Sequence, residues 1–194
     1  MNRRVSVRPA TKADAAMIAR AVAMAIGDEV ALRAYCGEDY LAVLTEIAGR
    51  EGTQYSWQRA LIAEVDGAAA GAIVGYDGAQ LEVLREGTFA VLREFVGRVS
   101  VVVDETEAGE YYLDSVAVVP EFRAFGVGRL LVESFCNRAF DEGHNRVGLI
   151  VDFDNPQAEK LYASLGFKCV GSRLFFGHKM WHMQRCVQTP KVVE

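Results

Sequence analysis

A short stretch with two glycines, "RAFGVGRLL", runs from Arg123 to Leu131 and has the residue types to bind an anion. Gly126 and Gly128 follow an apolar strand-like run and open an apolar helical one. A helix start offers unpaired backbone N–H groups and the positive end of the helix dipole, and glycine has no side chain to hold a phosphate away. The spacing matches neither the Walker pattern nor GxGxxG, so a nucleoside triphosphate is not predicted. A tight strand-to-helix turn without a ligand is the alternative.

A second candidate motif begins at Asn155, which is followed by Pro156. This pair is typical of a helix start, because asparagine caps the helix and proline suits its first turn. Tyr162 lies seven residues later, which is about two helical turns, so both residues are predicted to face one cleft. Tyr162 shares its helix face with apolar residues, and a core aromatic is therefore the alternative to a functional hydroxyl.

The elements that position these residues follow from the apolar periodicity. The pattern predicts a first strand at "VSVRPA", helices at about 13–26 and within 38–48, a hairpin turning at Asp66-Gly67, then strand, helix, strand and helix between 110 and 166. Two antiparallel strands at about 168–174 and 178–184 complete the predicted sheet. The order indicates an α/β (α+β) fold with a mixed, mostly antiparallel central sheet. We interpret residues 1–194 as one domain, with a helical insertion at about 77–109.

The composition restricts the classes of function. With 51% hydrophobic and 24% charged residues, the 194-residue chain is typical of a globular domain, and its net charge of -5 argues against a nucleic-acid partner. We expect no membrane span and no signal peptide, and hence a cytoplasmic location. Cys36, Cys136, Cys169 and Cys186 lack metal-ligand spacing, so we expect no metal site and four ordinary buried or half-buried thiols.

The two motifs together resemble the GCN5-related N-acetyltransferase (GNAT) superfamily. Its central motif is a strand that often contains "AV", then a proline, then Arg/Gln-x-x-Gly-x-Gly/Ala opening a helix, and this chain has "VAVVPEFRAFGVG". The stretch "NPQAEKLYASLGF", residues 155–167, is similar to the superfamily's asparagine, helix, tyrosine and "LGF" signature. The opening "VRPATKADAAMI" is also similar, so the resemblance covers nearly the whole chain outside residues 77–109.

The resemblance implies a fold with helices on both faces of the sheet, a parallel pair of strands that splay apart, and acetyl-CoA as cofactor. It places the pyrophosphate on the N–H groups of the glycine loop, the pantetheine arm along the backbone of the preceding strand, and an asparagine against the cofactor. The implied cofactor-binding residues are Val116, Ala117, Val118, Arg123, Ala124, Phe125, Gly126, Val127, Gly128, Arg129 and Asn155. The guanidinium groups of Arg123 and Arg129 are candidates to add charge.

Acetyl transfer to an amine needs an acid for the departing thiolate and a base for the incoming ammonium. The resemblance makes Tyr162 the candidate acid, because a phenol is still protonated at neutral pH. Family members that use a glutamate five residues before the asparagine have its counterpart here at Ile150, which cannot act as a base. Asp114 is the best-placed carboxylate, with Asp152 and Glu110 behind it, and a simple backbone contact is its alternative role.

We expect the acceptor to be a primary amine of a small molecule or of a protein. An acidic stretch containing Asp104, Glu105, Glu107 and Glu110 is predicted to border the entrance and attract a cation, although a solvated loop is the alternative. The aromatic strands "RLFFGHKMWHMQR" are a candidate homodimer contact or part of the acceptor pocket, and a core or interface role is expected for their histidines. A non-catalytic acyl-CoA-binding regulatory module is the alternative function.

Overall fold

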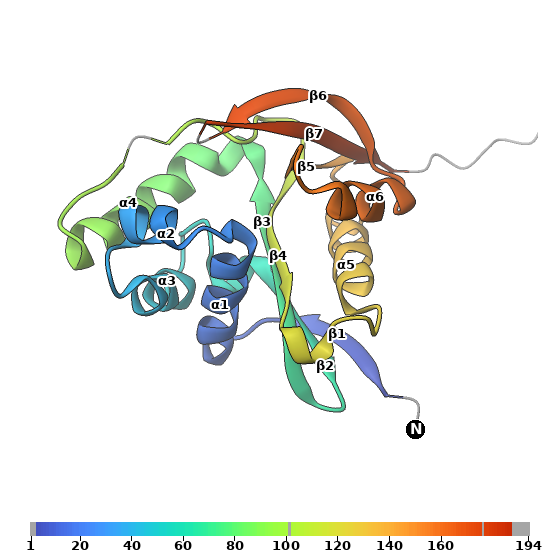
Figure 1. Ribbon diagram of the computed structural model, residues 1–194, viewed down its shortest axis with the longest axis horizontal. Helices are drawn as coiled ribbons and strands as arrows, with labels where there is room; N and C mark the ends of the chain where they lie inside the picture. Colours follow the sequence, from blue (N-terminus) through green and yellow to red (C-terminus); the bar gives the residue numbers. More distant parts are fainter. Residues whose placement is uncertain (1–2, 101, 176, 188–194) are drawn as a thin grey trace, which may run out of the picture.

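The protein contains a seven-stranded mixed sheet with the strand order β1-β2-β3-β4-β5-β7-β6 (Figure 1). The computed structural model describes residues 3–100, 102–175 and 177–187. The strands are β1 (Val5–Pro9), β2 (Ala60–Val65), β3 (Ala68–Asp77), β4 (Tyr111–Val118), β5 (Arg146–Asp152), β6 (Lys168–Phe175) and β7 (His178–Cys186). The helices are α1 (Ala15–Ile26), α2 (Glu29–Cys36), α3 (Tyr40–Gly49), α4 (Leu81–Phe95), α5 (Val127–Asp141) and α6 (Pro156–Ser164). Neighbouring strands are antiparallel except β4 and β5, which are parallel.

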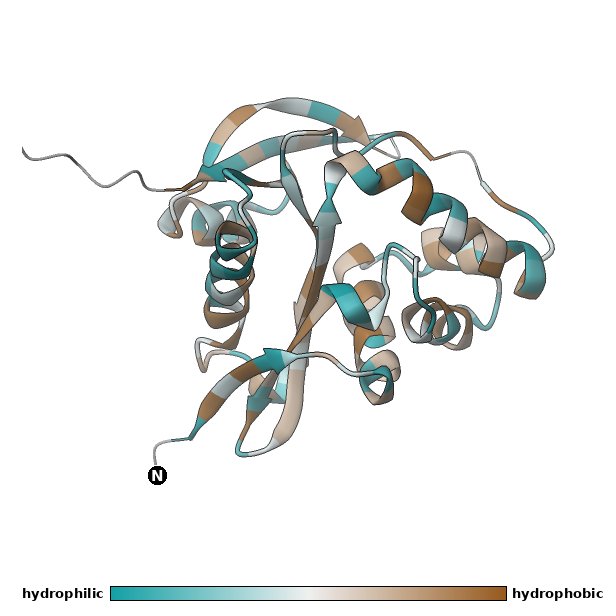
Figure 2. Cartoon of the chain, turned by 180° about the vertical axis from the view of Figure 1, so that it is seen from behind, coloured by the Kyte–Doolittle hydropathy of each residue, from teal (hydrophilic) through white to brown (hydrophobic). Residues whose placement is uncertain are grey.

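Helices cover both faces of the central strands, as expected. Figure 1 shows α1 to α4 on one side of β3 and β4, and α5 and α6 on the other. Each side has its own apolar core, because alternate strand residues point to opposite faces. Leu61, Ile73 and Leu113 join the α5–α6 core, whereas Ile62 and Ala72 join the α1–α3 core. Figure 2 shows brown, hydrophobic segments in the strands between the two groups of helices.

Most predicted elements are present, with shifted ends. The Asp66-Gly67 turn does join β2 to β3, and both residues adopt the positive φ that this tight hairpin requires (52° and 85°). The segment predicted to be a helical insertion contains α4, followed by a stretch without regular structure over 96–100 and 102–106. One helix was missed. The apolar pattern predicts no helix directly after Gly27, yet Asp28 starts α2 by accepting hydrogen bonds from the Val30 and Ala31 N–H groups.

The prediction for the cysteines is half wrong. Cys36 and Cys136 are buried thiols, as expected, but Cys169 and Cys186 are exposed, and all four are free. The two exposed residues lie on β6 and near the end of β7, a hairpin at the edge of the sheet whose outer strand is mostly exposed. No helix of the described residues is long and apolar enough to cross a membrane.

Candidate active site

The parallel strands β4 and β5 pair over only two residues. Tyr111 pairs with Val147 and Tyr112 pairs with Gly148, and beyond this point no further pairing joins the two strands. Both strands continue, β4 to Val118 and β5 to Asp152, so they part in the middle of the sheet. Peptide groups that are unpaired within a sheet need other partners. The parting of these strands therefore offers an extended ligand with amide groups a place to complete the ladder.

The backbone direction of β4 decides which of its residues offer such groups. The Val119 N–H donates to the Ala70 carbonyl of β3 at 2.9 Å. Successive residues of a strand direct their N–H and C=O groups to alternate edges, so Val116 and Val118 direct theirs toward β5 and Ala117 directs its own toward β3. Of the three residues predicted to contact the cofactor through backbone, only the two valines have groups that point to the open edge.

The loop before α5 forms a concave row of donors. Ala124 and Gly126 both have positive φ, 66° and 75°, and alternating backbone handedness turns successive N–H groups to one side. Among the described residues, none accepts a hydrogen bond from the N–H groups of residues 124–129. The N–H of Arg123 differs from the prediction, because it already donates to Pro120 at 3.2 Å. A Cβ added at Gly126 would have no protein atom within 4 Å, so this face is open to a ligand.

The two arginines of the motif hold the loop and its neighbours together. The Arg123 Nε donates to the Val118 carbonyl at 3.1 Å, which occupies one of the groups at the open edge of β4. The Arg129 Nη2 donates to the Ser164 hydroxyl of α6 at 2.7 Å, and its Nη1 lies 3.4 Å from Glu133. These side chains therefore link β4, α5 and α6 around the row of N–H groups. Their positive charge still lies beside the loop.

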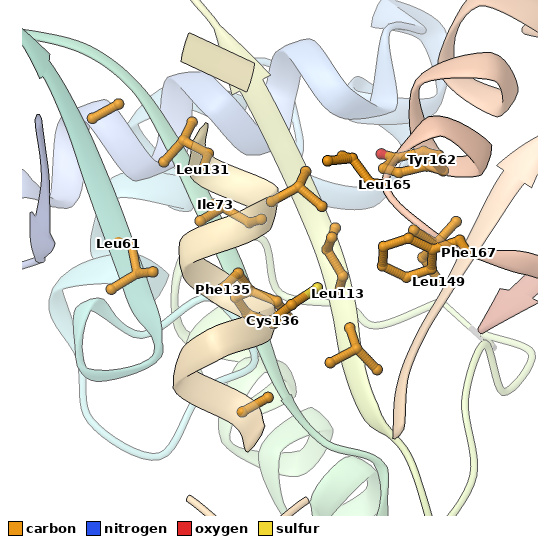
Figure 3. Close-up of a cluster of buried hydrophobic side chains, with 14 of the residues drawn as sticks. Leu61, Ile73, Leu113, Leu131, Phe135, Cys136, Leu149, Tyr162, Leu165 and Phe167 are labelled. Atoms are coloured by element: carbon orange, nitrogen blue, oxygen red, sulfur yellow. The ribbon is translucent and has the colours of Figure 1, made fainter. Parts of the chain in front are cut away.

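Asn155 and Tyr162 lie at opposite ends of α6. The Asn155 Oδ1 accepts a hydrogen bond from the Ala158 N–H at 3.1 Å, so asparagine does cap the helix. Tyr162 is buried, with 8% of its surface exposed, and its ring meets Phe167 edge-on with 5.7 Å between centroids. Figure 3 shows the Tyr162 ring within the α5–α6 core, with its hydroxyl directed toward the strand that carries Leu113. Burial raises the pKa of Tyr162 to about 12, which keeps its hydroxyl protonated.

Asp114 is the extra residue of a β-bulge. Val74 of β3 pairs with Ser115 and the next residue, Gly75, pairs with Leu113, so Asp114 stands opposite no residue of β3. A bulge re-aims the side chains at its position. Here it turns Asp114 to the face of the sheet that α4 covers, where its Oδ2 lies 3.3 Å from the Tyr76 hydroxyl and its Oδ1 accepts from the Ser115 hydroxyl at 2.9 Å.

A buried polar network surrounds Asp114. The Tyr76 hydroxyl donates to Glu105 Oε1 at 2.9 Å, and Gln54 Nε2 lies within 3.0 Å of that hydroxyl and 3.1 Å of Glu105 Oε1. Arg85 pairs with the other oxygen of Glu105 at 2.9 Å. Burial, followed by the negative charge of Glu105, raises the pKa of Asp114 to about 7. A carboxyl with this pKa exchanges protons near neutral pH.

The two predicted catalytic side chains approach the parting strands from opposite faces. Tyr162 packs in the α5–α6 core, whereas Asp114 contacts Tyr76 in a cluster formed with Leu81, Leu84 and Tyr112. Ile150, where other family members have a glutamate, packs against this same cluster. Asp114 therefore lies on the sheet face to which the side chain at position 150 also points, but it projects from the neighbouring strand.

The predicted acidic rim is wrong for two of its members. Glu105 and Glu110 are 4% and 2% exposed, so they are buried and do not form a solvated border. Glu110 accepts hydrogen bonds from Thr106 and Gln184 at 2.7 Å and lies 2.8 Å from the ring Nε2 of His182. Burial alone would raise the pKa of Glu110, but these hydrogen bonds outweigh burial and lower it. Of the core or interface role expected for the two histidines, burial in the core is confirmed for His182, whereas His178 is exposed and does not lie in the core.

Gln54 and Arg85 belong to the Asp114 network and were not found by sequence reasoning. They lie 60 and 29 residues before Asp114 along the chain, in a loop and in α4 respectively. Neither lies in a motif, and a lone glutamine or a helical arginine is by default a surface residue. Only the fold brings them together, so no local signal identifies them.

Comparisons with known proteins agree with this geometry. Residues 31–167 match the model of the Acetyltransferase (GNAT) family. A solved structure described as an acetyltransferase is 34% identical and superposes with a TM-score of 0.81, covering 94% of this chain and 100% of that one. An N-acetyltransferase from Staphylococcus aureus Mu50 is 25% identical, with a TM-score of 0.80 and coverage of 92% and 99%. The mycothiol acetyltransferase of Kocuria rhizophila is 43% identical over 65 residues, which are 34% of this chain and only 21% of that protein.

Proposed function

Since this chain belongs to the acetyltransferase (GNAT) family, we propose that it transfers an acetyl group from acetyl-CoA directly to a primary amine. The observation that carries this proposal is the parting of β4 and β5 beside a row of unpaired N–H groups at the start of α5. These two features suit the two chemically different parts of one cofactor. The open strand edge suits an arm with amide groups, and the row of N–H groups suits a diphosphate.

The residues present fit acetyl-CoA. The N–H groups of residues 124–129 would hold the diphosphate, and the open space above Gly126 lets it approach. The backbone groups of Val116 and Val118 would pair with the pantetheine arm, with the Val118 carbonyl already bound to Arg123. Asn155 uses its oxygen as a helix cap, which leaves its amide NH2 to donate. Acetyl-CoA supplies the activated acetyl group and a thiolate leaving group.

Asp114 and Tyr162 divide the proton transfers. An amine acceptor arrives mostly as ammonium at neutral pH and must lose a proton before it can attack. Asp114, whose pKa is raised to about 7, takes that proton from the side of the sheet that α4 covers. Tyr162, kept protonated by burial, gives its proton to the departing sulfur from the other side. With acetyl-CoA bound, the nitrogen would gain the acetyl group as the carbon–sulfur bond breaks. The second proton of the nitrogen would restore the Tyr162 phenol, and the sulfur would leave as a thiol.

The acceptor is a primary amine that carries positive charge before reaction. The support for this is the carboxylate pair of Asp114 and Glu105 on the acceptor side, where Arg85 is the one oppositely charged side chain in contact among the residues that the structure describes. Primary amines that carry positive charge occur both in small molecules and in proteins. The relative from Kocuria rhizophila is named a mycothiol acetyltransferase, and the short match leaves both acceptor classes for experiment.

One experiment tests the proposal. The protein is mixed with acetyl-CoA and a panel of cationic, neutral and acidic amines together with lysine-containing peptides, and release of free thiol is followed. We expect acceptor-dependent thiol release, fastest with a cationic amine. Binding of acetyl-CoA measured by calorimetry without any acceptor-dependent release would contradict transfer and would favour the acyl-CoA-binding module instead.

A further inference from the structure

The hydroxyl of Tyr76 has one proton and two carboxylates within reach. It lies 2.9 Å from Glu105 Oε1 and 3.3 Å from Asp114 Oδ2, and Tyr76 itself is completely buried. A hydroxyl donates one hydrogen bond and accepts up to two. The hydroxyl is within donating distance of both acids, and donation to Asp114 would lower the Asp114 pKa, but the shorter distance favours Glu105 as the acceptor of the single proton. The Gln54 amide donates to the same hydroxyl oxygen at 3.0 Å. One lone pair of that oxygen is then left to face Asp114.

The contacts of Glu105 hold its carboxylate where it accepts the hydrogen bond from the Tyr76 hydroxyl. Its Oε1 accepts hydrogen bonds from the Tyr76 hydroxyl and the Gln54 amide, and its Oε2 pairs with Arg85 at 2.9 Å. The side chain of Glu105 is only 5% exposed, and that of Arg85 is 13% exposed, so water competes little for these bonds. Asp104 also pairs with Arg85, at 2.5 Å, but its side chain is 64% exposed. The two neighbouring acids thus share one arginine while only Glu105 enters the network.

We propose that Glu105 is a positioning residue for acetyl transfer: it claims the proton of Tyr76 and thereby presents Asp114 with an oxygen lone pair instead of a donor. An ionised Asp114 carboxylate gains nothing from that lone pair, whereas a protonated Asp114 donates a hydrogen bond to it. The direction of the hydrogen bonds therefore makes Asp114 ready to receive the proton of the ammonium. The inference rests on the proposed role of Asp114 as the general base.

The other groups around Asp114 do not replace this effect. The titratable side chains whose pKa responds to its charge are Tyr35 of α2, Tyr55, Tyr76 of β3 and Tyr112 of β4, and the charged groups that act on it are Glu105 and Arg85. Ser115, on the same strand, donates to Asp114 and favours its ionised form. β5 presents the apolar Ile150 to this cluster. Within the part of the chain that the structure describes, Glu105 is thus the one group that acts on Asp114 both through charge and through the Tyr76 bond.

The test is the titration of Asp114 in the full-length resting protein, followed by carbon-13 NMR of its carboxyl carbon and assigned with Asp114→Asn. In Glu105→Gln we expect the midpoint to fall by about 1 pH unit, and the acidic limb of kcat/KM to move with it. Asp104→Asn is the matched control, because it removes an adjacent acid with the same arginine partner, and its midpoint should stay within about 0.3 pH unit of wild type. Equal midpoints in Glu105→Gln and wild type, or equal shifts in both variants, would overturn the inference.

The Tyr76→Phe variant tests the direction of the hydrogen bond between Tyr76 and Asp114 independently, through the sign of the shift in the Asp114 titration midpoint. If Tyr76 accepts from protonated Asp114, its loss lowers the Asp114 midpoint; if Tyr76 instead donates to Asp114, its loss raises the midpoint. A raised midpoint overturns the inference even where Glu105→Gln does not fold. The titration also separates this inference from the proposed function, since it needs no turnover. An unchanged pH–rate profile in Asp114→Asn would remove Asp114 as the base without altering what the titration reports about Glu105.

Discussion

Asp114 stands in a bulge of β4 with its carboxylate 3.3 Å from the hydroxyl of Tyr76 on β3. The bulge leaves Asp114 without a partner on β3 and turns its carboxylate toward a buried tyrosine and a buried glutamate. Bulges next to active sites commonly re-aim a functional side chain in this way. The bulge therefore places the Asp114 carboxylate where burial and the charge of Glu105 raise its pKa.

Asp114→Asn is expected to lower kcat by roughly 100-fold or more, because an amide cannot accept the proton of the ammonium. Wild-type kcat/KM should fall as the pH drops through about 7, since protonated Asp114 no longer acts as a base, and the variant should lose this limb. Steady-state rates across pH check both points. Asp152→Asn is the control, because Asp152 lies at the end of β5, pairs with His178 at 3.1 Å and is the second carboxylate considered as a base from the sequence. If Asp152→Asn removes the acidic limb instead, Asp152 is the base.

Tyr162→Phe is expected to lower kcat by about 10- to 1,000-fold while acetyl-CoA affinity stays within about twofold, because only the proton donor is removed. The hydroxyl has no hydrogen-bond partner among the described residues, so its loss should leave the free energy of unfolding nearly unchanged. Stopped-flow thiol release and calorimetry with coenzyme A measure the two quantities. Full turnover in this variant would mean that another group or water protonates the sulfur.

Gly126→Ala is expected to weaken acetyl-CoA binding by about tenfold or more, because a Cβ there intrudes on the row of N–H groups. The left-handed backbone of Gly126 also adds a stability cost of about 1 kcal/mol for any other residue. Gly143→Ala separates the two effects. Gly143 follows the other end of α5 with φ of 91° and open space at its Cβ, so its substitution should cost similar stability and leave binding unchanged. Equal acetyl-CoA affinities in the two variants would contradict a diphosphate site at the row of N–H groups before α5.

Local sequence signals predicted most of the elements, including those on either side of the predicted cofactor site. The Asp66-Gly67 hairpin, α5 after its glycine loop and α6 after Asn155 each carry their own turn or cap residue, so their positions follow from short stretches. The resemblance to the GNAT superfamily then predicted a cofactor site at the loop before α5, and the family match confirmed the family. The site residue roles themselves stay predictions, because they depend on a bound cofactor.

The acceptor side was not predictable in the same way. Its residues come from a loop, α4, β3 and β4, and charge alone does not reveal whether an acid is buried. Glu105 and Glu110 were read as parts of a solvated rim, but each is buried with hydrogen-bonding partners that lie far away in sequence. The bulge at Asp114 also depends on the register of β3 against β4, which no residue of "YYLDSVAV" specifies by itself.

Gly148→Ala is expected to destabilise the protein by about 2–4 kcal/mol. Gly148 forms the last pair before β4 and β5 part, and a Cβ there would lie 2.0 Å from Glu110 Oε2. The carboxylate of Glu110 cannot move aside freely, because it is buried and its bonds to Thr106, His182 and Gln184 would be lost. Urea unfolding measures the change. Gly171→Ala on β6, where a Cβ meets no atom within 4 Å, should stay within about 0.5 kcal/mol of wild type. Equal unfolding midpoints for the two variants would show that β5 or the Glu110 side chain moves to accommodate the added Cβ.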